Sequence, residues 1–402
     1  MVKGNDAITF FGYGKTTRAI AKKVGPSNFY DDNVSQPHKD EEGNQLNPSS
    51  EFQANYSNCE IPSPGMAPSH PLIQKAQNLI SEYDYFSDEM PPSVWISGTN
   101  GKTTTTQMIQ TLLASHGSQA GGNIGTPLAE LDTEASLWIL ETSSFTLHYT
   151  NQAVPQVYVL LPITPDHLYW HGSMHEYEEA KLKPLKMMKE GDAVIIPKKY
   201  ENYPTKAMKI TYESNEDLAT YFDIDITKLR FKGAFLQDAL LALGVSKILF
   251  DECDYECINA MALDAHRQEE LHDKDGRLWI NDSKATNLDA TIQAILTYQD
   301  HPLSLILGGD DKGVDLKPLF EKMQDLDIKL YAIGKNEATL LQLAKEFKLP
   351  IQGCHTLQKA CELIRSEKEN ERTVLLSPAA ASLDQFSSYG QRGDEFKKFA
   401  KL

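Results

Sequence analysis

The stretch GTNGKTTTT at positions 98–106 combines residue types that bind a nucleotide phosphate. Gly98 and Gly101 carry no Cβ, so the backbone there can approach an anion closely. Lys102 adds a positive charge for the outer phosphates, and Thr103 offers a hydroxyl to Mg²⁺ at the start of a helix. The apolar run before this stretch and the helical spacing after it predict a phosphate loop between a strand and a helix.

One position of this stretch departs from the usual phosphate loop, which has a glycine where Ile96 stands here. A plain strand-to-helix turn with a surface lysine is the alternative, although the flanking strand and helix favour the phosphate loop. The tetrapeptide GKTT also occurs at positions 14–17, so these four letters alone do not identify a triphosphate site.

The earlier copy of GKTT overlaps the turn GYG at positions 12–14. This turn directly follows a short apolar run, and Asp31 and Asp32 lie at about the spacing where a dinucleotide-binding fold places its ribose acid. The third glycine of that fingerprint is missing. We predict a crevice for a nucleotide or sugar nucleotide, with an ordinary Rossmann-type turn as a nearly equal alternative.

Polar residues end two later apolar runs of the central part of the chain. Glu141 closes LWILE, and Asp166 and His167 close YVLLPITPDH. Ligands of parallel sheets bind beyond the carboxyl ends of the strands, and Mg²⁺ prefers hard oxygen donors. Each residue alone would be a helix cap, an ion pair or an ordinary histidine, but their joint placement favours a metal site. Lys181, in the charged stretch HEYEEAKLKPL, is by itself expected to be a solvated lysine.

Two polar loops follow apolar runs in the last third of the chain. NDSKATN at positions 281–287 places Asp282, Lys284 and Thr286 on one loop, and GGDDKG at 308–313 contains Lys312. Their cations could gather anions from a neighbouring domain. The alternative is ordinary turn chemistry, because Asn, Asp, Ser and Gly dominate turns for local reasons.

These motifs sit in three units of alternating strands and helices, without an internal repeat. We expect domains at residues 1–91, 92–264 and 265–402, with the proline-containing stretch EMPPS at 89–93 as the first linker. The polar, turn-rich stretch 31–58 is predicted to be a surface loop or flap.

The composition limits the possible partners of the chain. The formal net charge of its 402 residues is −17, which argues against nucleic acid and anionic lipid as general partners. Five cysteines without a C-x-x-C pair indicate free thiols in a reducing compartment. We expect no signal region, because no charged stretch is followed by an apolar one at the start, and we expect no apolar run of membrane-spanning length. A cytoplasmic protein that does not enter a membrane is expected.

The ordered set of motifs resembles the Mur ligases over most of residues 8–400. The motifs that carry the resemblance are GTNGKTT, GGNIGTPL, LETSSFTL, PITPDHL, HRQE, NDSKATN, LILGGDDKG and LLSPAAASLDQFSSYGQRGDEF. NDSKATN is most similar to the loop of members that add D-glutamate. The phosphate loop of this family has the pattern G-[TS]-x-G-K-[TS], which accounts for the missing early glycine.

The resemblance implies an α/β fold of three domains: a Rossmann-like N-terminal domain that binds the UDP part of the substrate, a central parallel sheet of the P-loop ATPase type, and a Rossmann-like C-terminal domain that brings D-glutamate. It implies ATP-dependent addition of D-glutamate to UDP-N-acetylmuramoyl-L-alanine through an acyl phosphate in peptidoglycan precursor synthesis. ADP and phosphate are released. The expected cofactors are ATP, two Mg²⁺ ions and a carbamate formed from CO₂ on a lysine. A monomer is expected.

The resemblance also assigns roles to individual residues. The ATP-binding residues would be Gly98, Thr99, Asn100, Gly101, Lys102, Thr103 and Thr104, with Arg267, Asp282 and Lys284 from the third domain. The metal ligands would be Thr103, Glu141, His167 and carbamylated Lys181, and the catalytic groups Lys102, Asn123, His167 and Lys181. The UDP substrate would contact Gly12, Tyr13, Gly14, Lys15, Thr16, Asp31, Asp32, Ser63 and Gly65. D-Glutamate would contact Thr286, Lys312, Ser382 and Tyr389, the last where the family often has phenylalanine.

Two stretches depart from the family pattern. KGAFLQDALLAL has Ala234 and Phe235 where the family commonly has G-x-H-N, which leaves Gln237 or Asp238 for the adenine-side contact. Asn33 follows Asp32 where relatives often have Thr-Arg, so uracil recognition is expected to differ.

Three alternatives stay open from the sequence. The first is another Mur-type or folylpolyglutamate-type ligase. The second is a dinucleotide-binding oxidoreductase or sensor built on the GYG turn. The third is a P-loop regulatory protein without ligase chemistry.

Overall fold

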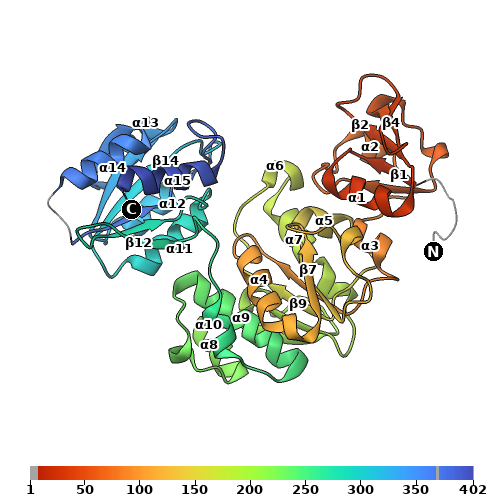
Figure 1. The fold of residues 1–402 in the computed structure, drawn as a ribbon, viewed down its shortest axis with the longest axis horizontal. Helices are drawn as coiled ribbons and strands as arrows, with labels where there is room; N and C mark the ends of the chain where they lie inside the picture. The colour runs from red at the N-terminus through yellow and green to blue at the C-terminus, as the bar shows by residue number, and fades with distance from the viewer. Residues whose placement is uncertain (1–7, 368–370, 402) are drawn as a thin grey trace. The chain divides into compact units, whose positions relative to one another are not determined.

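The computed structural model describes residues 8–367 and 371–401, which contain three β-sheets with helices packed against them (Figure 1). The described residues fall into two compact units. One runs through Arg230 and includes Gln237–Ala260, and the other comprises Phe231–Leu236 and the chain from Met261 onward. The predicted α/β class is confirmed.

The first sheet has the strand order β3-β4-β2-β1-β5. Its strands are β1 (Ile8–Phe11), β2 (Asn28–Asp31), β3 (His38–Lys39), β4 (Gln45–Pro48) and β5 (Cys59–Pro62), and only β3 runs antiparallel to its neighbour. Helix α1 (Lys15–Val24) follows β1, and α2 (Pro71–Lys75) follows β5. The buried Phe10, Ile20 and Phe29 form part of its core. The carboxyl ends of β1, β2 and β5 therefore meet at one edge.

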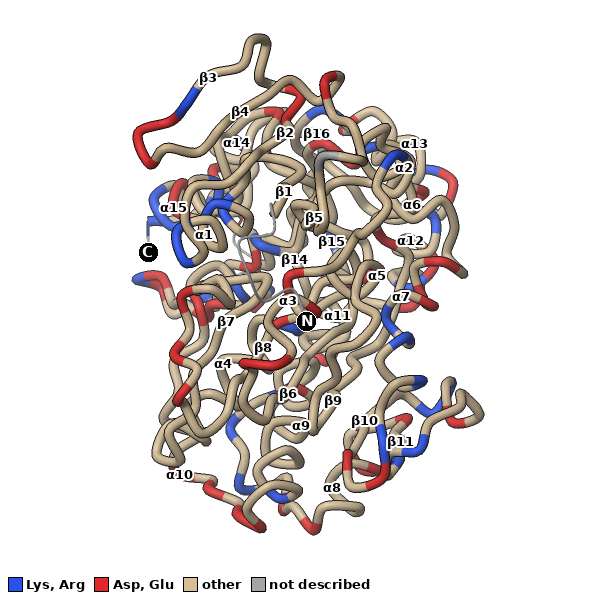
Figure 2. The backbone as a smooth tube through the Cα atoms, turned by 90° about the vertical axis from the view of Figure 1, so that its right-hand side faces the viewer, with Lys and Arg blue, Asp and Glu red and all other residues tan. Residues whose placement is uncertain are grey.

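The prediction of a loop or flap over 31–58 is wrong in part. β3, β4 and two short 3-10 turns (Ser49–Glu51 and Ala54–Tyr56) lie within this stretch, and β4 pairs in parallel with β2. β3 and the turn after it extend away from β1 and β2 (Figure 2). In β4 only Leu46 is both apolar and buried, so the sequence offers too short an alternation to indicate a strand.

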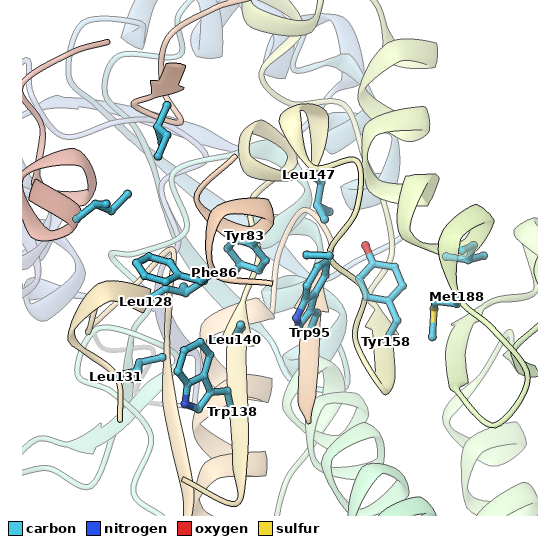
Figure 3. Packing of buried hydrophobic residues seen from close by; sticks show 14 of the residues in the cluster. Tyr83, Phe86, Trp95, Leu128, Leu131, Trp138, Leu140, Leu147, Tyr158 and Met188 are labelled. Carbon is cyan, nitrogen blue, oxygen red and sulfur yellow. The ribbon is translucent and has the colours of Figure 1, made fainter. Parts of the chain in front are cut away.

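The second sheet consists of six parallel strands in the order β11-β10-β9-β6-β8-β7. They are β6 (Ser93–Ser97), β7 (Ser118–Gly122), β8 (Leu137–Glu141), β9 (Val157–Leu160), β10 (Ala193–Pro197) and β11 (Met208–Tyr212). The central strands are buried on both faces, which explains their unbroken apolar sequences. Trp95, Trp138 and Tyr158 belong to this core (Figure 3).

Eight helices belong to this part of the described chain. They are α3 (Glu82–Phe86), α4 (Lys102–Leu113), α5 (Ser144–Tyr149), α6 (Leu168–His171), α7 (Met174–Met187), α8 (Asn215–Phe222), α9 (Gly233–Phe250) and α10 (Tyr255–Ala260). Contrary to the sequence expectation, α9 is long and apolar enough to cross a membrane by length and composition. Its residues Asp238–Ser246 are all buried within the protein, as in the core helix of a globular domain.

The third sheet has the order β12-β13-β17-β14-β15-β16, and only β12 is antiparallel to its neighbour. Its strands are β12 (Glu269–His272), β13 (Leu278–Asn281), β14 (Leu303–Gly308), β15 (Ile328–Ile333), β16 (Ile351–His355) and β17 (Thr373–Leu376). Its helices are α11 (Leu288–Tyr298), α12 (Lys317–Met323), α13 (Glu337–Phe347), α14 (Leu357–Ser366) and α15 (Tyr389–Ala400). Successive residues of β14, such as Leu305 and Ile306, enter two separate hydrophobic clusters. Because β17 lies between β13 and β14, the loops after these three parallel strands meet at one edge.

Candidate active site

The loop between β6 and α4 is built on two glycines that no other residue could replace without strain. Gly98 has φ +142°, and a Cβ there would overlap the side chain of Leu161. Gly101 has φ +84° at the N-cap of α4, and a Cβ there would lie 2.7 Å from Oδ1 of Asp238. The predicted strand, glycine turn and helix are all present, so the positive end of α4 lies at this turn, as at helix N-termini that bind phosphate.

Lys102 and Thr99 hold this loop in shape. Nζ of Lys102 donates hydrogen bonds to the carbonyl oxygens of Thr99 at 2.7 Å and Gly98 at 3.0 Å. The hydroxyl of Thr99 accepts a hydrogen bond from the backbone N–H of Thr164 at 2.9 Å and lies 3.0 Å from the hydroxyl of Tyr177. The phosphate loop is thereby joined to the segment after β9 and to α7.

Three of the predicted catalytic and metal-binding residues form one cluster. The hydroxyl of Thr103 donates to Oε2 of Glu141 at 2.9 Å, and Nδ2 of Asn123 donates to Oε1 of the same carboxylate at 2.8 Å. Glu141 ends β8 and is only 2% exposed. The start of α4 and the ends of β7 and β8 thus bring together residues that lie far apart in the sequence, because parallel strands end at one edge of the sheet.

Lys181 is not solvated, contrary to the expectation from its charged surroundings in the sequence. Lys181 lies on α7, and its side chain is buried in the protein. Its Nζ donates to the carbonyl oxygen of Gly98 at 2.8 Å and to Oγ of Ser97 at 3.3 Å. Burial lowers the pKa of Lys181 well below its usual value, and the nearby charge of Lys102 adds to this effect. The structure therefore favours an uncharged amine beside the phosphate loop.

His167 occupies an unusual backbone position at the edge of this region. It is the N-cap of α6 with φ +52°, and its backbone N–H donates to Oδ1 of Asp166 at 2.8 Å. Its ring lies 4.8 Å from the ring of Phe145, centroid to centroid, and its side chain is part-exposed. The imidazole of His167 is therefore accessible from solvent beside α5 and α6.

No group of three or more His, Cys, Asp and Glu side chains that could hold a metal occurs within residues 8–367 and 371–401. Hydroxyl, amide and modified lysine groups can also bind a metal ion. The donors at the phosphate loop are instead the hydroxyl of Thr103 and the carboxylate of Glu141, which already contact each other. Hard oxygen atoms beside a phosphate-binding turn fit Mg²⁺.

The turn after β1 is organised by residues predicted to bind the UDP part of a substrate. The backbone N–H of Tyr13 donates to Oδ2 of Asp31 at 2.7 Å. A Cβ at Gly12, whose φ is +87°, would lie 3.0 Å from Cβ of Ser63. Hydrogen bonds from Ser49 and His70 lower the pKa of Asp32. The carboxyl ends of β1, β2 and β5 therefore assemble this turn.

Lys15 is exposed and contacts a different part of the same unit. Its Nζ donates to the carbonyl oxygen of Gly125 at 2.7 Å, in the loop that also contains Asn123. Near the neighbouring Ser63 turn, Nε1 of Trp170 donates to the carbonyl oxygen of Gly65 at 3.0 Å. The first sheet thus shares hydrogen bonds with segments that follow β7 and β9.

Three loops meet at the carboxyl edge of the third sheet. The N–H of Ala379 donates to the carbonyl oxygen of Ala285 at 3.1 Å, and Asp310 and Ala381 exchange two backbone hydrogen bonds of 2.9 Å. These bonds join the loops that carry the residues predicted for D-glutamate, Thr286, Lys312 and Ser382.

Four more predicted residues of this unit are Lys284, Tyr389, Asp282 and Arg267. Nζ of Lys284 lies over the ring of Tyr389, 5.3 Å from its centroid. Asp282 is buried and accepts a hydrogen bond from Oγ of Ser377 at 2.8 Å. Burial raises the pKa of Asp282 to about 7. Arg267 is mostly buried, with Nε 3.7 Å from Oδ2 of Asp264.

Several supporting residues were not found by sequence reasoning. Thr17 donates to the carbonyl oxygen of Gly12 at 2.7 Å, Tyr177 contacts Thr99, and Ser97 contacts Lys181. Tyr177 lies four residues before Lys181 on one helix, a spacing that places both on the same face and could have indicated the pair.

Asp238, which the sequence left as one residue for the adenine contact, is buried in α9. Its Oδ1 accepts a hydrogen bond from the hydroxyl of Thr105 at 2.8 Å, beside Gly101. Its carboxylate therefore supports the start of α4. Its predicted role toward adenine stays untested.

Comparison with known proteins agrees with this geometry. The family model for the Mur ligase middle domain matches residues 96–239. A UDP-N-acetylmuramoylalanine–D-glutamate ligase of Campylobacter jejuni is 54% identical over 97% of this chain and 98% of the relative. One of Helicobacter pylori is 45% identical over 98% of this chain and 99% of the relative. The crystal structure of MurF ligase from Thermotoga maritima in complex with ADP has a TM-score of 0.61 at 16% identity, over 94% of both chains.

The chain therefore belongs to the Mur ligase family, an ATP-dependent class of three-domain ligases. Within that family its relatives are the UDP-N-acetylmuramoylalanine–D-glutamate ligases, as NDSKATN indicated in the sequence. The predicted resemblance is confirmed. The oxidoreductase and P-loop regulatory alternatives are set aside.

Proposed function

We propose that this protein joins D-glutamate to UDP-N-acetylmuramoyl-L-alanine and converts ATP to ADP and phosphate. The observation that carries the proposal is the cluster at the phosphate loop, where Thr103 and Asn123 both donate to Glu141 beside the buried Lys181. The names of the relatives support D-glutamate as the added amino acid.

ATP would be held mainly by the turn from Gly98 to Thr104. Backbone N–H groups at a helix N-terminus and the ammonium of Lys102 offer positive charge to the phosphates. In the structure this ammonium bonds to carbonyl oxygens of the same loop, and its place within the glycine turn supports the assignment to the outer phosphates. Arg267, Asp282 and Lys284 would contact ATP from the third domain.

Thr103, Glu141, His167 and a carbamate on Lys181 would hold magnesium. Bound Mg²⁺ supplies positive charge that neutralises the phosphoryl group during its transfer. The paired oxygen donors of Thr103 and Glu141 support this assignment. Asn123 keeps the carboxylate of Glu141 in place, because it donates to the oxygen that Thr103 leaves free.

A carbamate on Lys181 is supported by the burial of its amine. Only an uncharged amine can attack CO₂, and burial favours that form. Formation of the N–C bond, with loss of one amine proton, replaces a cation that would repel Mg²⁺ with an anionic oxygen donor. Ser97 and the carbonyl oxygen of Gly98 would orient the nitrogen that carries this group.

The reaction chemistry explains the need for ATP. A carboxylate is a poor electrophile, so the L-alanine carboxylate would first attack the γ-phosphorus and form an acyl phosphate, with ADP as the leaving group. The amine of D-glutamate would then attack the acyl carbon, and the tetrahedral intermediate would expel phosphate. His167 would lie beside the reacting carboxylate, and Asn123 beside the γ-phosphate.

The UDP part of one substrate would bind at the first sheet, and D-glutamate would bind at the third. The UDP part would contact the turn around Gly12, with Tyr13, Gly14, Lys15, Thr16, Asp31, Asp32, Ser63 and Gly65. D-Glutamate would contact Thr286, Lys312, Ser382 and Tyr389. We propose that the chain acts as a cytoplasmic monomer with domains at 1–91, 92–264 and 265–402.

Release of ADP with different amino acids tests this proposal. Purified protein is supplied with ATP, Mg²⁺ and UDP-N-acetylmuramoyl-L-alanine, and D-glutamate is compared with L-glutamate, L-alanine, L-lysine and meso-diaminopimelate. We expect ADP release and a ligated product, identified by mass, only with D-glutamate. Omission of the UDP substrate is the control. Turnover with another amino acid and none with D-glutamate would refute the proposal.

A further inference from the structure

Arg392 is a buried arginine in the first turn of α15. Its guanidinium donates three hydrogen bonds: from Nη2 to the carbonyl oxygen of Ser283 at 2.7 Å, from Nε to Oγ of Ser283 at 3.0 Å, and from Nη1 to the carbonyl oxygen of Ala380 at 3.1 Å. The residue is 1% exposed. Burial lowers the pKa of Arg392 to about 10, so the group keeps its charge at neutral pH.

Ser283, which receives two of these bonds, lies inside the NDSKATN loop. It stands between Asp282 and Lys284, and it is fully buried. Its hydroxyl donates to the carbonyl oxygen of Tyr389 at 2.8 Å while it accepts from Arg392. The bonds of Ser283 thus fix the loop after β13 against the start of α15.

The third acceptor, Ala380, lies in the loop after β17. It is two residues before Ser382, and its neighbour Ala379 donates from its N–H to the carbonyl oxygen of Ala285. All three oxygen atoms that accept from Arg392 are uncharged. A planar guanidinium with fixed donor directions sets a geometry between the two loops, which a flexible ammonium cannot do.

We propose that Arg392 is a positioning residue for D-glutamate, because it fixes the relative place of the loops that carry Thr286 and Ser382. This inference rests on the proposed function, which assigns both residues to the D-glutamate carboxylates. Arg392 is buried beneath these loops and acts through Ser283 and Ala380.

The conservative variant Arg392→Lys tests this geometry. A lysine keeps the charge, but its single ammonium cannot satisfy three acceptors from one planar fork. We expect the KM for D-glutamate to rise at least about tenfold, since a charge-assisted hydrogen bond contributes on the order of that factor or more. The KM for UDP-N-acetylmuramoyl-L-alanine should stay within about twofold, because its expected contacts lie on the first sheet.

Arg277→Lys is the matched control. Arg277 is a second buried arginine of the same unit, and it donates to the carbonyl oxygens of Ile364 at 2.8 Å and Glu367 at 3.4 Å, before the amino end of β13. Its replacement should lower the melting temperature comparably and leave the KM for D-glutamate unchanged. An equal rise in that KM in both variants would show general destabilisation and overturn the inference.

A milder variant keeps the test decisive if Arg392→Lys does not fold. Ser283→Ala removes the hydroxyl that joins Arg392 to Tyr389 and leaves the carbonyl contact in place. We expect a smaller rise in the KM for D-glutamate, on the order of threefold, for the loss of neutral partners. An unchanged KM in a folded Ser283→Ala or Arg392→Lys protein would refute the positioning role. If the unaltered protein does not use D-glutamate at all, the proposed function itself fails, which is a separate result.

Discussion

Nζ of Lys181 donates a hydrogen bond of 2.8 Å to the carbonyl oxygen of Gly98, 83 residues earlier in the chain. This bond joins α7 to the first glycine of the phosphate loop. Tyr177, one turn earlier on α7, places its ring 4.9 Å from the same nitrogen and its hydroxyl 3.0 Å from that of Thr99. Lys181 and the phosphate loop are therefore coupled, so a substitution in one is expected to alter the position of the other.

Replacement of Lys181 should strongly impair ligation while the protein stays folded. In Lys181→Ala we expect ADP release with D-glutamate to fall by on the order of a hundredfold, as for loss of a metal-site residue. Short carboxylic acids such as formate or acetate should restore part of the rate, because they can supply the oxygen atoms of the missing carbamate.

The control for this experiment is Lys186→Ala on the same helix. Lys186 pairs with Glu179 at 2.9 Å and is half-exposed, so its loss should leave the rate unchanged. Initial rates with and without added acid provide the measurement. Unimpaired ligation by Lys181→Ala would refute the carbamate.

Glu141→Gln should change the Mg²⁺ dependence of the reaction. The substitution preserves the shape of the side chain but removes the charge that Thr103 and Asn123 now contact. We expect the Mg²⁺ concentration at half-maximal rate to rise about tenfold or more. Glu134→Gln, at an exposed position before β8, is the control and should not alter the titration. A normal Mg²⁺ curve for Glu141→Gln would remove this carboxylate from the metal site.

Much of this site could be predicted from local sequence. The glycines of GTNGKTT stand directly between an apolar strand and a helical pattern, so this loop can be found from adjacent residues. Glu141 can be found because parallel strands end at a common edge of the sheet. These features depend on short-range spacing and on a general rule of sheets. The same rule accounts for the meeting of the NDSKATN and GGDDKG loops at one edge of the third sheet, which the sequence analysis did not predict.

The burial of Lys181 and the role of Arg392 could not be predicted in this way. Lys181 lies among charged residues, so its sequence pattern indicates solvent, and its burial follows from contacts with Ser97 and Gly98. Arg392 contacts Ser283 from 109 residues away. Side-chain hydrogen bonds over such separations leave no periodicity in the sequence.

Gly101→Ala should disrupt ATP binding through two effects. An alanine at φ +84° is strained by about 1–2 kcal/mol, and its Cβ would lie 2.7 Å from Oδ1 of Asp238. We expect a loss of ADP release on the order of a hundredfold, because the loop must move about 1 Å from its working position. Binding of a fluorescent ATP analogue measures the effect directly.

Gly191→Ala is the control for an alanine at a positive-φ glycine outside the phosphate loop. Gly191 has φ +93°, but a Cβ there would meet nothing within 4 Å. We therefore expect this variant to lose a little stability and to bind the analogue normally. Equal losses of binding in both variants would mean that the contact with Asp238 is not the cause.

Glu82 is a buried carboxyl at the start of α3, where the chain passes from the first sheet to the second. Its Oε1 accepts a hydrogen bond from the backbone N–H of Leu128 at 3.2 Å. Burial raises the pKa of Glu82 from 4.5 to about 8. The folded protein therefore holds this proton more tightly than the unfolded chain does.

This proton makes stability depend on pH with a definite sign. The contribution of Glu82 is complete below pH 4.5, where both states are protonated, and it is lost as the pH rises toward about 8. Glu82→Gln resembles the protonated acid in shape and keeps the acceptor for Leu128, but it cannot ionise. We expect the variant to be more stable than the unaltered protein by on the order of 4 kcal/mol at pH 8, and nearly equal to it at about pH 4. Thermal melts of both proteins across this pH range measure the difference in stability, with Glu134→Gln as the exposed control. A difference in stability that stays constant with pH would show that Glu82 is not protonated in the folded protein.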